Sequence, residues 1–148
     1  MSSSPDPAAA TDRAGSVDAA FRLQVGRFRA GEQRRIFPMR VSLGLPAVAA
    51  VETELPWPVS PEFDAGLRFD LVCGLVDEWM ASGGGPAFGW LTRPGAPQSH
   101  DRDLEWYSAT VRACAAYDCE LLGFRAVTRS GWWDVETGRS RVWRRLRL

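Results

Sequence analysis

The last ten residues of the chain, 139–148, combine arginine and tryptophan at a spacing that suits anion binding. Side chains alternate between the two faces of a β-strand, so one face of this segment would carry every second residue. The members of that face are Arg139, Arg141, Trp143, Arg145 and Arg147, with Arg129 and Trp132 shortly before them. Arginine binds phosphates and carboxylates through paired hydrogen bonds, and an indole stacks on nucleic-acid bases. The pattern therefore predicts a binding face for a nucleic acid or an acidic protein partner.

The uneven distribution of charge leaves a second interpretation of this face open. Residues 121–148 hold seven arginines and two acids, a balance of +5, whereas residues 46–80 hold seven acids and one arginine, a balance of −6. Such asymmetry indicates either a basic surface for an acidic partner or neutralisation inside the fold. In the second case the arginines would cover the acidic segment 61–82 or lie on a solvated strand.

Tryptophan is frequent, with seven in 148 residues. A core of this size does not bury all of them with their N–H groups satisfied, so several should be partly exposed. Exposed tryptophan beside arginine is typical of binding hot spots. This composition favours an interaction surface over a buried catalytic pocket.

A second candidate site is the sequence His-Asp-Arg-Asp at residues 100–103. His100, Asp101 and Asp103 could bind a metal ion or transfer protons in a small metal-assisted hydrolase or nuclease. Helix capping accounts for both acids equally well, with Asp101 as the N-cap and Asp103 in the first turn. Capping is the simpler interpretation, so the sequence assigns no catalytic residue, no metal ligand and no cofactor.

The composition excludes several classes of catalytic machinery. All eighteen basic residues are arginine, and His100 is the only histidine. Without lysine there is no Walker A phosphate loop, no kinase strand lysine and no Schiff base. A single histidine excludes zinc sites built from two or three histidines of one chain. These exclusions favour a non-enzymatic binding module.

The cysteines and the N-terminus indicate a cytoplasmic protein. Cys73, Cys114 and Cys119 are odd in number and lack zinc-ligand spacing, so we expect reduced thiols, mostly buried. The N-terminal residues do not have the pattern of a secretory signal, and no apolar run approaches the roughly 18 residues of a membrane span. We therefore expect no membrane partner.

The length predicts one domain, residues 18–148, after a disordered N-terminal lead at residues 1–17. Alternation of apolar and polar residues predicts a hairpin of two strands, 20–29 and 36–45. A helix is the alternative for the first of them, because the spacing of Phe21, Val25 and Phe28 is also helical. The proline-containing residues 46–59 are interpreted as a connector, with Trp57 packed on the core.

Residues 61–82 give the clearest helix, with Ser60 as N-cap, Pro61 in the first turn and apolar residues every fourth position. Glycines 83–85 end it. The elements expected after it are a strand at 86–93, a helix at 102–117, a strand at 120–128 and a hairpin of 132–135 with 139–147. The whole is an α+β fold with a mixed, mostly antiparallel sheet of about five or six strands and two main helices on one face.

The segments 89–95, 127–132 and 143–146 resemble small uncharacterised cytoplasmic proteins of GC-rich actinobacteria. The resemblance covers the C-terminal half of the chain and carries no function, so it implies only a bacterial, cytoplasmic origin. A further interpretation is a structural subunit that forms a homo-oligomer by pairing its terminal strand with another chain.

Overall fold

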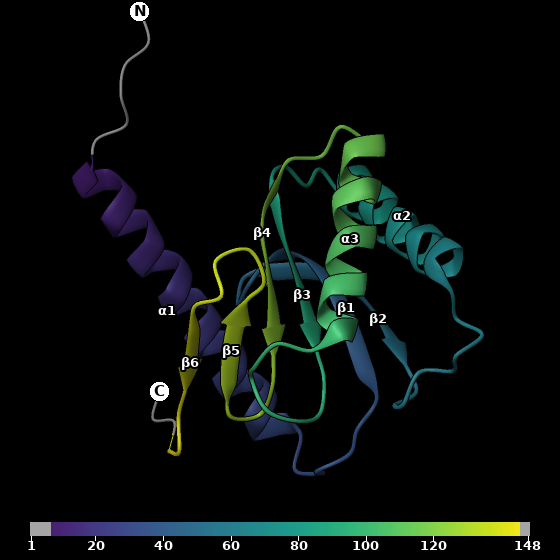
Figure 1. Ribbon diagram of the computed structural model, residues 1–148. Coiled ribbons are helices and arrows are strands. Elements are labelled where there is room, and N and C mark those ends of the chain that lie inside the picture. Colours follow the sequence, from purple (N-terminus) through teal and green to yellow (C-terminus); the bar gives the residue numbers. More distant parts are fainter. Residues whose placement is uncertain (1–6, 146–148) are drawn as a thin grey trace, which may run out of the picture.

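The computed structural model describes residues 7–145, and their side chains from residue 13 onward. Six strands form one mixed sheet in the order β2-β1-β3-β4-β5-β6, in which only β3 and β4 are parallel. The strands are β1 (Met39–Leu45), β2 (Ala49–Leu55), β3 (Ala87–Thr92), β4 (Leu121–Val127), β5 (Gly131–Asp134) and β6 (Ser140–Val142). This open sheet confirms the α+β class (Figure 1).

Helices cover both faces of the sheet (Figure 1). The larger core lies beneath α2 (Ala65–Ala81) and α3 (Asp101–Ala116), which pack side by side on one face, as the sequence predicted for two helices. The smaller core lies beneath α1 (Pro7–Gly31) on the opposite face. Neighbouring residues of β3 separate the two cores: Leu91 belongs to the first and Trp90 to the second. Each face of the sheet therefore has its own helical cover.

The prediction of a strand at residues 20–29 is wrong, because these residues lie within α1. Phe21 and Val25, four residues apart, are fully buried against the sheet. The alternation of a strand and the four-residue spacing of a helix coexist in this segment, and only the partner surface selects between them. The helix begins at Pro7, inside the lead expected at 1–17, of which residues 1–6 lie outside the described chain.

The hairpin at the start of the sheet is formed by β1 and β2, so the connector interpretation of 46–59 is also wrong. All seven residues of β1 pair with β2, from Met39 opposite Leu55 to Leu45 opposite Ala49. Pro46 and Pro56 lie on either side of β2, and Glu52 and Glu54 share one of its faces, as is common for an edge strand. Trp57 does pack on the larger core, as expected.

Both main helices begin at caps other than the predicted ones. Asp64, not Ser60, caps α2 by accepting a hydrogen bond from the Leu67 amide at 3.0 Å. His100, not Asp101, caps α3 through Nδ1, which accepts from the Arg102 amide at 3.1 Å. Between residues 7 and 145, no helix combines the length and the apolar character that a membrane span requires.

The C-terminal half follows the prediction closely until its last strand. β3, α3, β4 and β5 each lie within a residue or two of their expected bounds. The last strand is shorter: β6 covers three residues, Ser140–Val142, rather than 139–147. Of the arginine face proposed on it, Arg147 lies outside the described residues.

Candidate functional site

A groove of 560 Å³ lies between α1 and the exposed edge of the sheet at β6. We call it the α1–β6 groove. Its lining residues are Asp18, Ala19 and Arg22 from α1, Trp132 from β5, and Arg139, Ser140, Arg141 and Trp143 from β6 and its flanks. The fold thus brings four of the predicted binding residues, Trp132, Arg139, Arg141 and Trp143, to one place.

Trp132 forms part of the groove but is not available for base stacking. Its side chain is completely buried, and the Arg125 guanidinium lies 3.9 Å from the centre of its ring. The Arg139 guanidinium lies over the same indole at 5.8 Å. Cation–π contact of this kind occupies the ring face that a nucleic-acid base would need. In this arrangement the Trp132 ring is not open to a base.

Asp18 of α1 is the carboxylate that binds the basic residues of this region. One of its oxygens accepts from Arg125 at 2.9 Å, and the other accepts from Arg139 at 2.5 Å. Burial lowers the pKa of the Arg125 guanidinium, and Asp18 opposes that shift. The partial neutralisation left open by the sequence thus comes from Asp18 of α1 and from Asp134 of β5, which lies 3.7 Å from Arg125. Helix α2 of the acidic segment covers the other face of the sheet.

The remaining basic residues of the C-terminal segment face solvent. Arg141, Arg144 and Arg145 are exposed, and within residues 13–145 no carboxylate lies within ion-pair distance of them. Trp143 is half-buried against the smaller core. Its carbonyl oxygen accepts from Arg29 of α1 at 3.4 Å, which anchors the chain end to the helix.

Arg129 does not belong to the α1–β6 groove. It lines a separate cavity of 500 Å³ together with Arg35 and Ser130. Its Nε atom is buried there without a hydrogen-bond partner among the described residues. The structure therefore separates Arg129 from the four predicted binding residues that line the groove.

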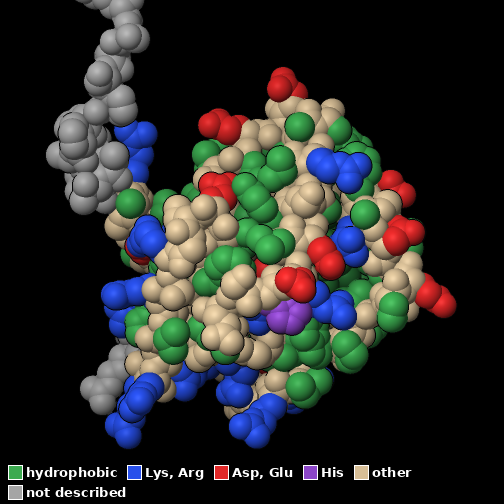
Figure 2. All heavy atoms as spheres, in the orientation of Figure 1, with side chains coloured by type: hydrophobic (Ala, Val, Ile, Leu, Met, Phe, Trp, Pro, Cys, Tyr) green, Lys and Arg blue, Asp and Glu red, His purple; other side chains and the backbone are tan. Residues whose placement is uncertain are grey.

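The basic residues gather on one side of the molecule (Figure 2). In this view most arginines lie along the left and lower margins, where Figure 1 places β6 and the C-terminal end of α1. Most acidic residues lie above and to the right, over α2, α3 and the segments that join them. A neutral chain with such a separation presents a distinct positive surface to an anionic partner.

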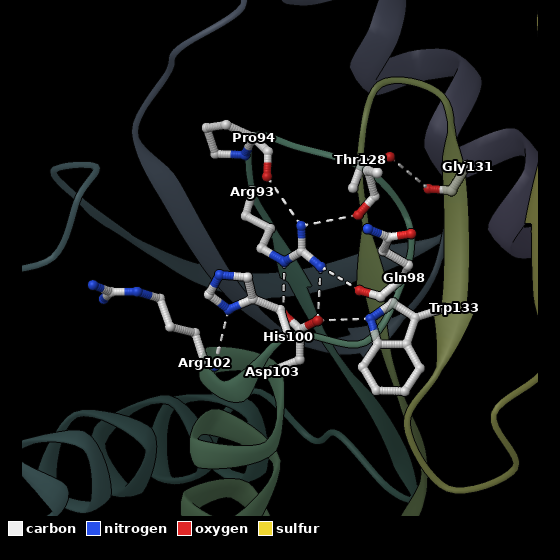
Figure 3. A network of polar contacts seen from close by, with 10 residues as sticks. Arg93, Pro94, Gln98, His100, Arg102, Asp103, Thr128, Gly131 and Trp133 are labelled. Carbon is white, nitrogen blue, oxygen red and sulfur yellow. Dashed lines mark hydrogen bonds and ion pairs between the residues drawn. The ribbon is translucent and has the colours of Figure 1, made fainter.

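Within the second predicted candidate, residues 100–103, Asp103 belongs to a buried structural network (Figure 3). Asp103 is fully buried and accepts from Arg93 at both carboxylate oxygens, at 2.7 and 2.8 Å. Its Oδ2 also accepts from Trp133 Nε1 at 2.6 Å. Arg93 in turn donates to the carbonyl oxygens of Pro94, Ala96 and Gln98. The ion pair thereby holds the loop after β3 against the start of α3.

This network removes Asp103 from the proposed metal set, because its carboxylate is buried and already bound. Both oxygens of Asp103 are occupied, and Nδ1 of His100 serves as the helix cap. In the described part of the chain, no three His, Cys, Asp or Glu side chains are grouped so as to hold a metal ion. Asp101 is exposed in the first turn of α3, where a negative charge stabilises the helix.

Comparison with known proteins finds no match for the chain among family models, curated proteins or solved structures.

Proposed function

We propose that this chain is a non-enzymatic binding module that holds a nucleic acid along its basic edge. The edge consists of the α1–β6 groove and the exposed arginines that follow it, Arg144 and Arg145. One observation carries the proposal: Arg141 and these two arginines have no carboxylate partner within residues 13–145 and lie beside a groove that two further arginines line.

The chemistry of the edge suits phosphate contacts more than base recognition. Guanidinium groups bind phosphate oxygens in pairs, and a one-signed surface raises the rate of encounter with a polyanion. With Trp132 buried, Trp143 is the indole of the groove that remains accessible for stacking. One stacked base contributes about 1–3 kcal/mol, so most of the affinity should be electrostatic and depend little on sequence.

Fluorescence anisotropy with labelled single-stranded and duplex oligonucleotides tests the proposal. Three phosphate contacts release enough counterions to lower the affinity about 20–40-fold between 50 and 200 mM salt. Absence of binding at 50 mM salt, or binding that salt does not change, would contradict a nucleic-acid partner.

A pair of charge-matched variants locates the interface. Replacing Arg141 with glutamine should weaken oligonucleotide binding severalfold at low salt and reduce the salt slope by about 1. Arg112→Gln is the control, because this exposed arginine lies on α3, on the other face of the sheet. An equal effect of Arg112→Gln would show that net charge, not the basic edge, governs binding.

An acidic protein is the alternative partner for the same charges. Polyglutamate, added as a competitor at matched charge concentration, distinguishes the two classes. We expect it to displace the oligonucleotide poorly, because it lacks the tetrahedral phosphates and the bases. Displacement at equal concentration would assign the edge to acidic proteins instead.

The exposure of β6 supports a second candidate function, assembly through the sheet edge. This edge strand is exposed at all three residues, and the side chain of Val142 is 61% exposed. Unpaired strand edges bind further strands. Light scattering of the free chain tests this candidate: a dimer that the substitution Val142→Glu converts to a monomer would support it, and a monomer at all concentrations would contradict it.

A further inference from the structure

Two buried hydrogen-bond donors beside the α1–β6 groove lack acceptors. They are Nε1 of Trp132 and Nη1 of Arg125, and neither has a partner among the described residues. The two side chains are in direct contact, with the guanidinium 3.9 Å from the centre of the indole. Buried donors are almost always satisfied, because leaving one unpaired is costly. Two unpaired donors in one contact indicate that an acceptor from outside the chain completes them.

The space next to these donors suits an anion. Arg139 and Arg141 line the groove, together with the Ser140 hydroxyl, and Asp18 is the single acid among the lining residues that the structure describes. Both oxygens of Asp18 already accept hydrogen bonds, from Arg125 and Arg139. The volume of 560 Å³ is within the range of small-molecule sites.

We propose that the α1–β6 groove is a site for a terminal phosphate group, that is, a phosphate monoester. The guanidinium groups of Arg139 and Arg141 bind its outer oxygens, and Nε1 of Trp132 donates to the oxygen that reaches deepest. The inference rests on the proposed function where a nucleic-acid end supplies the phosphate, but the site can be tested with phosphate alone.

The arrangement of donors favours a monoester over an internal phosphodiester. Trp132 is completely buried, so only a group that projects from the end of a molecule can extend to its indole. A diester has chain on both sides and two free oxygens, whereas a monoester has three. The donors come from β5 and from β6 and its flank, so they approach the groove from several directions. A tetrahedral phosphate has oxygens in more directions than a planar carboxylate and therefore suits them better.

Access to the indole requires a shift of one flexible side chain. The Arg139 side chain is 51% exposed and lies over Trp132. The shift breaks the ion pair of Arg139 with Asp18, which is partly exposed to water and therefore weak. A phosphate that binds its guanidinium can draw it outward and expose the Nε1–H beneath, so that binding and access occur together.

Indole signals in ¹H–¹⁵N NMR spectra of the full chain provide a direct test. The Trp132 signal is assigned with the variant Trp132→Phe, and inorganic phosphate is then titrated into the native chain. We expect the Trp132 signal to shift downfield and to saturate. The signals of Trp79 and Trp133 are internal controls and should not move, because their Nε1 atoms already donate to Gly85 and Asp103.

Further arms of the experiment identify the source of the phosphate. Arg141→Gln should raise the phosphate concentration for half-saturation about tenfold, and Arg112→Gln should leave it unchanged. A 5′-phosphorylated oligonucleotide should bind at least tenfold more tightly than the same strand with a 5′-hydroxyl, and only the first should move the Trp132 signal.

The possible failures are distinguishable. A Trp132 signal that neither phosphate nor the phosphorylated strand moves would overturn the site, even if both oligonucleotides bind the basic edge. An equal shift with acetate would overturn the assignment to phosphate. If inorganic phosphate moves the signal while neither oligonucleotide binds, the site stands as one for a small phosphorylated molecule and the proposed nucleic-acid function fails.

Discussion

Replacing Asp103 with asparagine tests whether the segment 100–103 is structural or catalytic. The substitution keeps the shape of the side chain but removes its charge and turns one acceptor into a donor. In the native fold the carboxylate accepts from Arg93 at 2.7 and 2.8 Å and from Trp133 at 2.6 Å. After the substitution, a donor faces a donor, and the Arg93 guanidinium loses its anionic partner.

The size of the effect follows from burial. The side chains of Arg93 and Asp103 are 2% and 0% exposed, so water does not replace the lost contact. Breaking a buried ion pair by removing one partner costs about 3–5 kcal/mol. For a chain of this size, each kcal/mol corresponds to roughly 2–4 °C in Tm, so the expected fall is on the order of 10–15 °C. Such a loss is a large fraction of the stability of a typical domain.

Urea denaturation followed by tryptophan fluorescence measures the change in the free energy of unfolding. Asp101→Asn is the matched control, since it removes the same charge from the same turn of α3 at an exposed position. The control should cost no more than about 1 kcal/mol, the contribution of a charge near a helix N-terminus. If the two variants lost equal stability, or Asp103→Asn less than about 1 kcal/mol, the structural interpretation would be refuted.

Three further predictions concern the hairpin, the thiols and acid stability. Gly131→Ala should separate β5 from β6 and abolish phosphate binding, because the added Cβ atom would overlap the facing carbonyl oxygen of β6. Gly74→Ala on α2 is the control, because the space around this glycine is open. In urea denaturation it should be neutral or stabilising by up to about 1 kcal/mol. Burial raises the pKa of all three thiols, that of Cys114 to about 12. Cys73 is half-buried whereas Cys114 and Cys119 are buried, so Cys73 should react fastest with Ellman's reagent in the folded chain. Three thiols reacting at one rate would contradict this. The side-chain hydrogen bond from Arg34 lowers the pKa of Glu32 from 4.5 to about 2. The contribution of the ionised Glu32 carboxylate to the free energy of unfolding is therefore present above pH 4.5 and is lost as the pH falls towards 2. The ¹³C chemical shift of the Glu32 carboxylate measures this titration. A midpoint above pH 4 would contradict the lowered pKa.

The elements between residues 61 and 135 were predictable because their signals are local. Apolar residues at helical spacing, a glycine run and proline-glycine loops each specify a conformation within a few residues. The caps were displaced because several residues able to cap occur near each helix start. Ser60 and Asp64 both qualify before α2, and packing of the helix against β1 and β2 selects the later one.

The first half of the sheet was not predictable on the same grounds. Residues 20–29 satisfy the spacing of a helix and of a strand, and β2 is flanked by prolines that resemble a connector. In both cases the secondary structure is selected by contact with residues that are distant in the chain. The smaller core beneath Phe21 selects the helix, and pairing with β1 selects the strand.

The candidate site was predicted in its composition and not in its geometry. Arg139, Arg141 and Trp143 were nominated from spacing and do meet in the groove. Arg125 is a lone arginine in an otherwise apolar strand, a pattern that indicates a buried acceptor for its guanidinium. Asp18 carried no signal, since nothing in the residues around it indicates a partner in β4.

By itself the sequence determined the class of the fold, most elements after residue 60, an arginine-only set of basic groups and a C-terminal segment suited to anions. Only the tertiary structure decided which of the arginine side chains are bound by carboxylates of the same chain. Asp18 binds Arg125 and Arg139, which are 107 and 121 residues away along the chain. Local patterns act over one or two turns of the chain, whereas ion pairing and burial depend on distance in space. For that reason only the folded chain shows that Trp132 is buried beneath two guanidinium groups. It also shows that the side chains of Arg141, Arg144 and Arg145 are exposed to a partner.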